Sequence, residues 1–143
     1  MAVRIGIAVA ILALAVAIAW WLDHRRAPAP PTQGRPTVPQ QLDRNDFPRP
    51  GAAWLVVLFT SATCESCAGL LDKAAPLESD DVAVAEVEYT ANRELHRRYA
   101  IDAAPVTVLA DAQGVTRASF VGAFAAAELW SALARLRDPT TAG

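Results

Sequence analysis

The sequence predicts an α/β sandwich on a mixed sheet, preceded by one N-terminal membrane helix, and three observations lead to this. The first is a run of 18 uncharged residues at 5–22, and the second is the segment 27–50, which holds seven of the ten prolines. The third is the order of patterned segments after residue 51: strand, helix, strand, helix, strand, strand, helix. A βαβ unit followed by a hairpin and a helix packs its helices against a mixed sheet.

The apolar run 5–22 is long enough for a membrane-spanning helix. At about 1.5 Å per residue it extends roughly 27 Å, close to the ~30 Å hydrocarbon core of a bilayer. Trp20 and Trp21 close the run, where aromatic rings favour the membrane interface. A cleaved signal peptide is the alternative, since Arg4 precedes the run and Ala17-Ile18-Ala19 fits a cleavage site. We expect an uncleaved anchor because such a cut would leave two tryptophans near the new terminus.

Composition sets the expected domain boundaries. Residues 1–26 form the predicted anchor and 27–39 a proline-rich linker, because proline fixes φ and favours extended chain. Residues 40–138 form the predicted globular domain, and 139–143 are a tail. Within the domain, Gln40–Phe47 is expected to supply a short edge strand or turn that docks on the sheet.

Hydrophobic patterns identify the strands. Trp54–Phe59 is a continuous apolar run, as expected for a strand buried on both faces. Val82–Val87 alternates apolar with other residues, and Val106–Leu109 is rich in β-branched residues. The turn sequence Asp111–Gly114 then leads into Val115–Val121, which completes a hairpin.

Three segments have helical composition or spacing. Ala68–Ala75 consists of good helix formers and ends at Pro76. Asn92–Ala100 is expected to be a short polar helix whose solvated face includes His96. Phe124–Leu136 closes the domain with apolar residues at helical spacing.

Cys64 and Cys67 are the only cysteines and directly follow the first predicted strand. A Cys-x-x-Cys pair can be a redox dithiol, half of a metal site or a structural disulfide. A disulfide that closes so short a loop removes little entropy from the unfolded state, which disfavours the structural role. Zinc needs four ligands, and His24 and His96 are poor candidates for the remaining two. The spacing therefore favours a redox dithiol.

Position in the fold predicts different roles for the two thiols. Cys64 is expected in the first turn of a helix capped by Thr63, where the helix dipole lowers the pKa of Cys64. Cys67 lies one turn further on the same face, from which it can attack a mixed disulfide at Cys64. We therefore predict Cys64 as the nucleophile and Cys67 as the resolving cysteine, with Glu65 and Ser66 tuning the pair.

From about residue 40 to residue 136 the chain resembles the thioredoxin family. The resemblance rests on Cys-x-x-Cys after a buried strand, on Ala104-Pro105-Val106, and on Val121-Gly122 before the last helix. It implies a thioredoxin-like three-layer sandwich with a central mixed sheet. It also implies that Pro105 is cis and lies against the dithiol, and that the backbone of Ala104 pairs with a substrate strand.

Three residues around the dithiol depart from thioredoxin's Trp-Cys-Gly-Pro-Cys. Thr63, Glu65 and Ser66 replace its Trp, Gly and Pro, and the resemblance implies a substrate contact for Thr63. Glu65 is shared with the Cys-Glu-Pro-Cys motif of thioredoxin-like proteins that reduce apocytochrome c. Those proteins have a single N-terminal anchor as well, although the proline of their motif is missing here.

Two further departures concern proton transfer. Leu58 replaces the buried acid that serves as proton acceptor in thioredoxin, and Glu86 stands at the place of its lysine companion. By this comparison Cys67 must lose its proton to water or to another group such as Glu65. The pattern favours exchange with a dedicated partner over general thioredoxin activity.

Two other functions remain open at the sequence level. Copper-carrying proteins of thioredoxin-like fold are also anchored and combine a cysteine pair with a distant histidine, which here would be His96. The other is a thioredoxin-like domain that binds partners without chemistry. Thiol–disulfide exchange by the cysteine pair requires no cofactor and no metal.

Charge and cysteine chemistry indicate the partners and the compartment. From Gly51 onward the chain has seven Lys and Arg against twelve Asp and Glu, a net charge of −5, which argues against nucleic acid. We expect a monomer outside the cytoplasm, acting on protein thiols and disulfides together with a membrane redox partner. Arg25 and Arg26 after the span favour the opposite orientation.

Overall fold

The computed structural model describes residues 1, 6, 13–18 and 36–141, and the chain divides into the units Met1–Gly34 and Arg35–Gly143. In the first unit, residues 13–18 are helical and exposed. None of the helices in the described part of the chain is long and apolar enough to cross a membrane. Most of the predicted span 5–22 lies outside the described residues, as does most of the predicted linker, so the anchor stays a prediction.

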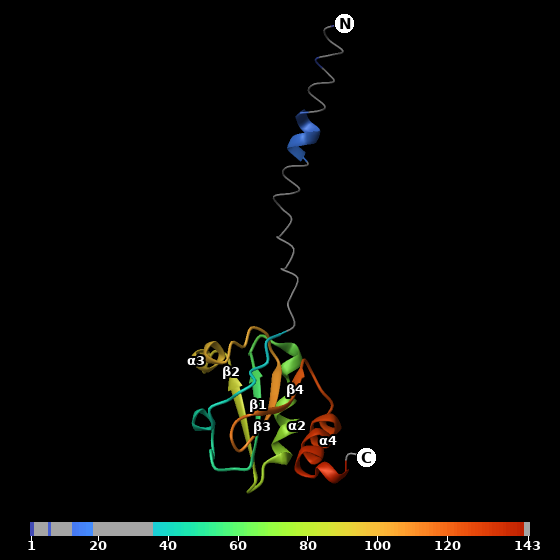
Figure 1. Cartoon of the computed structure of the whole chain (residues 1–143). Helices are drawn as coiled ribbons and strands as arrows, with labels where there is room; N and C mark the ends of the chain where they lie inside the picture. The colour runs from blue at the N-terminus through green and yellow to red at the C-terminus, as the bar shows by residue number, and fades with distance from the viewer. Residues whose placement is uncertain (2–5, 7–12, 19–35, 142–143) are drawn as a thin grey trace. The chain divides into compact units, whose positions relative to one another are not determined.

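The second unit is built on one four-stranded sheet (Figure 1). Its strands, in the spatial order β2-β1-β3-β4, are β1 Trp54–Thr60, β2 Val82–Glu88, β3 Val106–Asp111 and β4 Thr116–Val121. Strand β1 is parallel to β2 and antiparallel to β3, and β3 is antiparallel to β4. The predicted mixed sheet, with its βαβ unit and its hairpin, is confirmed.

Three described α-helices accompany the sheet: α2 Leu70–Ala74, α3 Arg93–Arg98 and α4 Ala126–Arg137. One-turn 3-10 helices are also present among the described residues: η1 Arg44–Asp46, η2 Glu65–Cys67, η3 Ala75–Leu77 and η4 Pro139–Thr141. The prediction of a helix starting at Ala68 is wrong. Gly69 has φ +72°, a left-handed conformation that glycine adopts without steric cost, and it separates η2 from α2.

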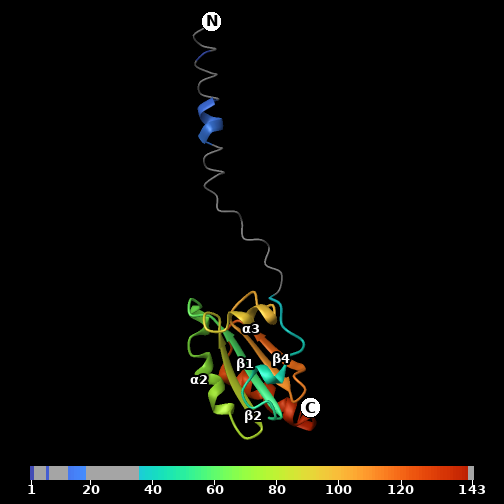
Figure 2. The same ribbon diagram turned by 90° about the vertical axis from the view of Figure 1, so that its left-hand side faces the viewer.

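Strand β1 lies between two hydrophobic clusters. In Figures 1 and 2, α3 lies on one side of the sheet, and α2 and α4 lie on the other. Its run from Leu55 to Thr60 is buried throughout, because both faces of the sheet are covered. Leu55, Val57 and Phe59 face the residues of segment 36–50 and α3, whereas Val56 and Leu58 face α2 and α4. The predicted three-layer arrangement is confirmed. Burial of each aliphatic side chain stabilises the folded state by about 1.5–3 kcal/mol relative to leaving it exposed.

The segment 36–50 is here called the N-terminal strap. Its central part, residues 40–47, docks on the domain as predicted. Gln41 forms a β-bridge with Val115, and the Leu42 amide donates to the Gly114 carbonyl at 2.8 Å. Leu42 and Phe47 are buried in the core. Gly114 has φ +80°, and a Cβ at this position would overlap the Leu42 carbonyl oxygen, so the close approach of the strap requires glycine.

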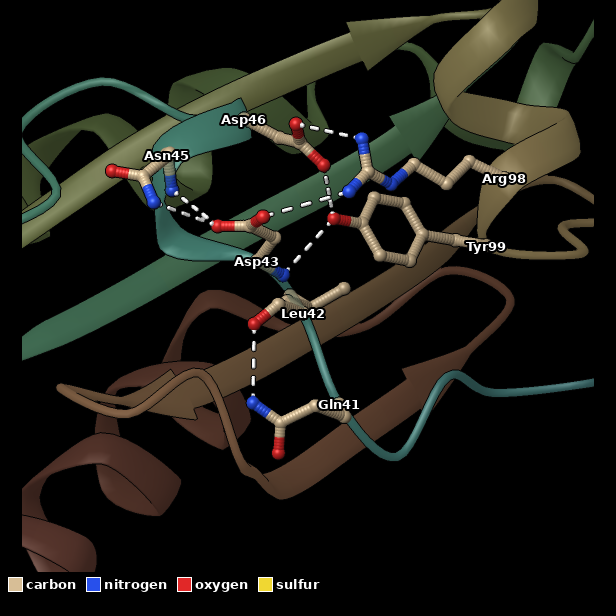
Figure 3. Close-up of polar contacts among 7 residues, drawn as sticks. All are labelled: Gln41, Leu42, Asp43, Asn45, Asp46, Arg98 and Tyr99. Carbon is tan, nitrogen blue, oxygen red and sulfur yellow. Dashed lines mark hydrogen bonds and ion pairs between the residues drawn. The ribbon is translucent and has the colours of Figure 1, made fainter.

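A polar cluster ties the strap to the end of α3 (Figure 3). The Asp43 amide donates to the Tyr99 hydroxyl at 3.0 Å, and that hydroxyl donates to Asp46. Arg98 forms ion pairs with Asp46 at 3.2 Å and Asp43 at 3.5 Å. Burial, followed by the hydrogen bond to Asp46, raises the pKa of Tyr99 to about 12. The Tyr99 hydroxyl therefore stays protonated and keeps both contacts across the physiological pH range.

Candidate active site

The cysteine pair occupies the turn that follows β1. Cys64 precedes η2 and Cys67 ends it, and the two sulfur atoms form a disulfide between Cα atoms 5.4 Å apart. The Cys67 amide donates to the Cys64 carbonyl at 3.2 Å, which closes the turn and brings both side chains to one side. Both cysteines are half-buried, so the disulfide is reachable from solvent.

The predicted placement of Cys64 in the first turn of an α-helix is wrong. The α-helix begins only at Leu70, beyond the left-handed Gly69. Thr63 is not a cap either, since its side chain is exposed and its hydroxyl lies 3.1 Å from Ser61 Oγ. The positive end of an α-helix therefore does not adjoin Cys64, which precedes only the one-turn 3-10 helix η2. A polar contact to its sulfur comes instead from Ser66, whose Oγ lies 3.4 Å from Cys64 Sγ.

A cleft of about 960 Å³, here called the dithiol cleft, opens beside Cys64. It brings together five of the residues predicted from the sequence: Thr63, Cys64, Glu65, Ser66 and Ala104. It also includes His96, which the sequence suggested only as a candidate metal ligand, and five residues that the sequence analysis did not select: Ser61, Tyr89, Ile101, Asp102 and Ala103. The cleft thus places apolar and acidic side chains next to the nucleophilic sulfur predicted here.

Ala104 lines the dithiol cleft, and Pro105 follows it in the chain. Their peptide bond is cis, as the family resemblance implies. Ala104 is half-buried on the cleft, while Pro105 is buried behind it and its carbonyl accepts the Gly122 amide at 2.9 Å. Ala104 is therefore accessible to whatever occupies the cleft.

His96 is not part of a solvated face, and that prediction is wrong. Its side chain is only 3 % exposed, and its Nε2 bonds the Val87 carbonyl oxygen at 2.8 Å. The rings of Phe59 and Tyr89 meet it edge-on at 5.5 and 5.3 Å. Helical spacing could have revealed this, because His96 lies between the core residues Leu95 and Tyr99 on one face. The described residues contain no group of three metal-ligating side chains suitably arranged for a metal ion.

A second cleft of about 290 Å³, here called the carboxylate cleft, is lined by both cysteines. Its acidic lining residues are Asp72, Glu86 and Glu88. No lysine, arginine or histidine lines it among the described residues. Leu58, which takes the place of the family's buried acid, is completely buried and pairs with Glu86 across β1 and β2. The acidic groups of the carboxylate cleft therefore come from α2 and β2 and not from β1.

Glu88 holds the loop that carries the cysteines. Its carboxylate accepts the Ala62 amide at 3.2 Å and the Ala91 amide at 3.0 Å. Hydrogen bonds from the backbone of Thr90 and then of Ala91 lower the pKa of Glu88, because they stabilise its charged form. Glu88 thus remains an anion that bridges the loops after β1 and β2.

Comparison with known proteins agrees with this geometry. The family model described as Thioredoxin matches residues 49–135, and no curated protein matches the chain. Among solved structures, Fasciola hepatica thioredoxin is 26% identical, with a TM-score of 0.51, covering 60% of this chain and 83% of that chain. A reduced Schistosoma mansoni thioredoxin pre-protein is 22% identical, with a TM-score of 0.49, covering 59% and 80%.

A third solved structure supports the fold alone. It is described as a malarial protein, is 16% identical and has a TM-score of 0.51, covering 58% of this chain and 96% of that chain. The family match spans more than half of the chain and includes the cysteine turn, the cis peptide bond and every strand of the sheet. The chain therefore belongs to the thioredoxin family.

Proposed function

We propose that this protein is a membrane-anchored thiol–disulfide oxidoreductase that acts on cysteine pairs of extracytoplasmic proteins. The observation that carries the proposal is the Cys64–Cys67 disulfide, half-buried at the edge of the dithiol cleft in a chain of the thioredoxin family. A pair so placed is accessible to a second protein, whereas a structural disulfide is more commonly buried and inert to exchange.

The proposed reaction is an exchange of one disulfide for another. In the reduced protein the Cys64 thiolate attacks a substrate disulfide, which forms a mixed disulfide and releases one substrate thiolate. Cys67 then attacks Cys64 Sγ, which restores the Cys64–Cys67 disulfide and releases the second substrate thiol. The same steps run backwards when the substrate is a dithiol, so the relative reduction potentials decide the direction.

The dithiol cleft supports the choice of a protein as substrate. Its walls combine the apolar side chains of Tyr89 and Ile101 with the backbone of Ala104. Such a surface suits an extended chain, whose backbone can bond Ala104 while a neighbouring apolar side chain packs on the ring of Tyr89. Thr63 lies at the same cleft and is proposed to contact the substrate on the side of Cys64.

The proposed membrane anchor and the proposed extracytoplasmic location rest on the sequence. The uncharged run 5–22 and the proline-rich segment after it suit a membrane helix and an extended tether. An exposed dithiol on a tether is most useful where other cysteine pairs are formed and broken, which is outside the cytoplasm. A membrane redox partner would then recycle Cys64 and Cys67.

An exchange assay with the full chain tests the activity. In a glutathione redox buffer, the wild-type protein is expected to speed the equilibration of a peptide that carries two cysteines. Cys64→Ser should abolish this catalysis, because the nucleophile is lost. Cys67→Ser should also stop turnover but accumulate a mixed disulfide with the peptide, because Cys64 can attack and nothing resolves the product. Wild-type activity in Cys64→Ser would refute the proposed function.

A further inference from the structure

In the resolving step, Cys67 attacks the mixed disulfide at Cys64, and a nearby group must accept the proton of Cys67. Only a thiolate attacks a disulfide efficiently, so Cys67 must lose the proton on Sγ before it can attack Cys64. At the position of the family's buried acid, β1 carries Leu58, which is completely buried and apolar. The required group must therefore come from another element.

The register of the sheet shows which side chains flank Leu58. Thr107 on β3 and Glu86 on β2 are its partners on the two neighbouring strands. Thr107 is fully buried, and its hydroxyl is among the described buried groups without a hydrogen-bond partner; a hydroxyl is too weak an acid or base to hold the proton. Glu86 is the ionisable member of this row.

Glu86 is oriented toward the cysteine turn. The Thr60 hydroxyl donates to Glu86 Oε1 at 2.8 Å, which fixes the carboxylate at the end of β1 where the cysteine turn begins. Glu86 and Cys67 both line the carboxylate cleft, and its volume of about 290 Å³ admits water between them. Among the described residues no donor binds the other carboxylate oxygen, Oε2, which leaves it available.

The other acidic groups are less suited to this role. Glu88 lines the same cleft but both of its oxygens accept backbone amides, which lower its pKa and keep it charged. Asp72 on α2 lines the cleft, and no hydrogen bond from the described part of the chain positions its carboxylate. Glu65 lines the dithiol cleft beside Cys64 and is not among the residues around the carboxylate cleft.

We propose that Glu86 is the proton acceptor for Cys67 in the resolving step, an inference that rests on the proposed exchange function. The proton on Cys67 Sγ passes through water in the carboxylate cleft to Glu86 Oε2. The thiolate electron pair forms the bond to Cys64 Sγ, and the bond from Cys64 to the substrate sulfur breaks. The departing substrate thiolate takes up the proton that Glu86 releases. In the opposite direction the Glu86 carboxyl group protonates Cys67 when a substrate thiolate attacks Cys64.

A single-turnover experiment isolates this step. The reduced full chain is mixed with a disulfide of a coloured aromatic thiol, and release of the second coloured thiolate reports the attack of Cys67 on Cys64. This leaving group is already stable as an anion, so the rate depends on deprotonation of Cys67. At pH 6, Glu86→Gln should slow this release about tenfold or more, as expected for loss of a general base. Above about pH 9 the two rates should converge, because Cys67 then ionises in water unaided.

Asp72→Asn is the matched control, since it removes one negative charge from the same cleft. It should keep the wild-type rate at pH 6 within about twofold, and Glu86→Gln should keep the wild-type midpoint of thermal unfolding.

A uniform slowing of Glu86→Gln at every pH, or an equal slowing of both variants, would overturn the role of Glu86. If wild type resolves the mixed disulfide and Glu86→Gln does so equally fast, this inference fails while the proposed function stands. If wild type releases no second thiolate and resembles Cys67→Ser, the proposed function fails and this inference with it.

Discussion

Cys64 and Cys67 differ in the surroundings of their sulfur atoms. Cys64 lines both the dithiol cleft and the carboxylate cleft, whereas Cys67 lines only the latter. Ser66 Oγ lies 3.4 Å from Cys64 Sγ and can donate a hydrogen bond to a thiolate there. The acidic side chains of the carboxylate cleft adjoin both cysteines, so among the described residues the contact with Ser66 is what distinguishes the sulfur of Cys64.

These surroundings predict an order of reactivity in the reduced protein. Cys64 should be alkylated by iodoacetamide at least several-fold faster than Cys67 at pH 7, as measured by mass spectrometry of the labelled peptides. Ser66→Ala should slow the labelling of Cys64, because it removes the donor to the thiolate. Thr63→Val is the control, since its hydroxyl contacts Ser61 and not the sulfur. Faster labelling of Cys67 would reverse the roles assigned to the two cysteines.

At the scale of elements, the N-terminal strap covers one face of the sheet together with α3. It adds Leu42 and Phe47 to the core that contains Phe59 and Tyr99. Two kinds of contact attach the strap: a hydrogen bond between Tyr99 and Asp46, and a close backbone contact between Leu42 and Gly114. Exposed ion pairs of the kind made by Arg98 contribute only about 0–1 kcal/mol, so the buried side chains and the backbone contact matter most.

Substitution of Gly114 tests the backbone contact. Gly114→Ala should lower the free energy of unfolding by about 2–4 kcal/mol, because it adds the cost of a positive φ to a clash with the Leu42 carbonyl. Gly122→Ala is the matched control: its φ is +88°, but nothing lies within 4 Å of the added Cβ. It should therefore lose only about 1–2 kcal/mol in urea denaturation. Equal losses in both variants would show that the strap does not depend on this contact.

At the scale of the whole chain, the proposed anchor and the redox domain make a joint prediction about topology. The protein should sediment with membranes and resist extraction by high salt, because about 18 apolar residues in a bilayer are not released by screening charge. Alkaline phosphatase fused after Gly143 should be active, since that reporter needs an extracytoplasmic location.

The matched control for topology is a reporter that works only in the cytoplasm, fused at the same point. It should be inactive in the same cells. The reverse pair of results would mean that Arg25 and Arg26 set the orientation, and the dithiol would then face a reducing compartment. Release of the chain by salt would rule out the anchor itself.

The sequence by itself determined those features that depend on local pattern and on chain order. The apolar run Trp54–Phe59 and the turn signal Asp111–Gly114 were sufficient for the strands and the hairpin. The spacing of Cys64 and Cys67 placed the two thiols close enough for the disulfide that the structure shows. These features are short in range: burial on two faces requires continuous apolar residues, and a disulfide between neighbours requires only a tight turn.

The tertiary structure alone decided what surrounds the cysteines. Composition favoured a helix from Ala68, yet the left-handed Gly69 delays it to Leu70 and removes the helix end from Cys64. His96 looked solvated among charged neighbours, yet it is buried against Phe59 because α3 packs on the sheet. The approach of Glu86 to the dithiol follows from strand register, which pairs residues 28 positions apart in the chain. Such contacts arise from packing between distant segments, and local propensity carries no information about them.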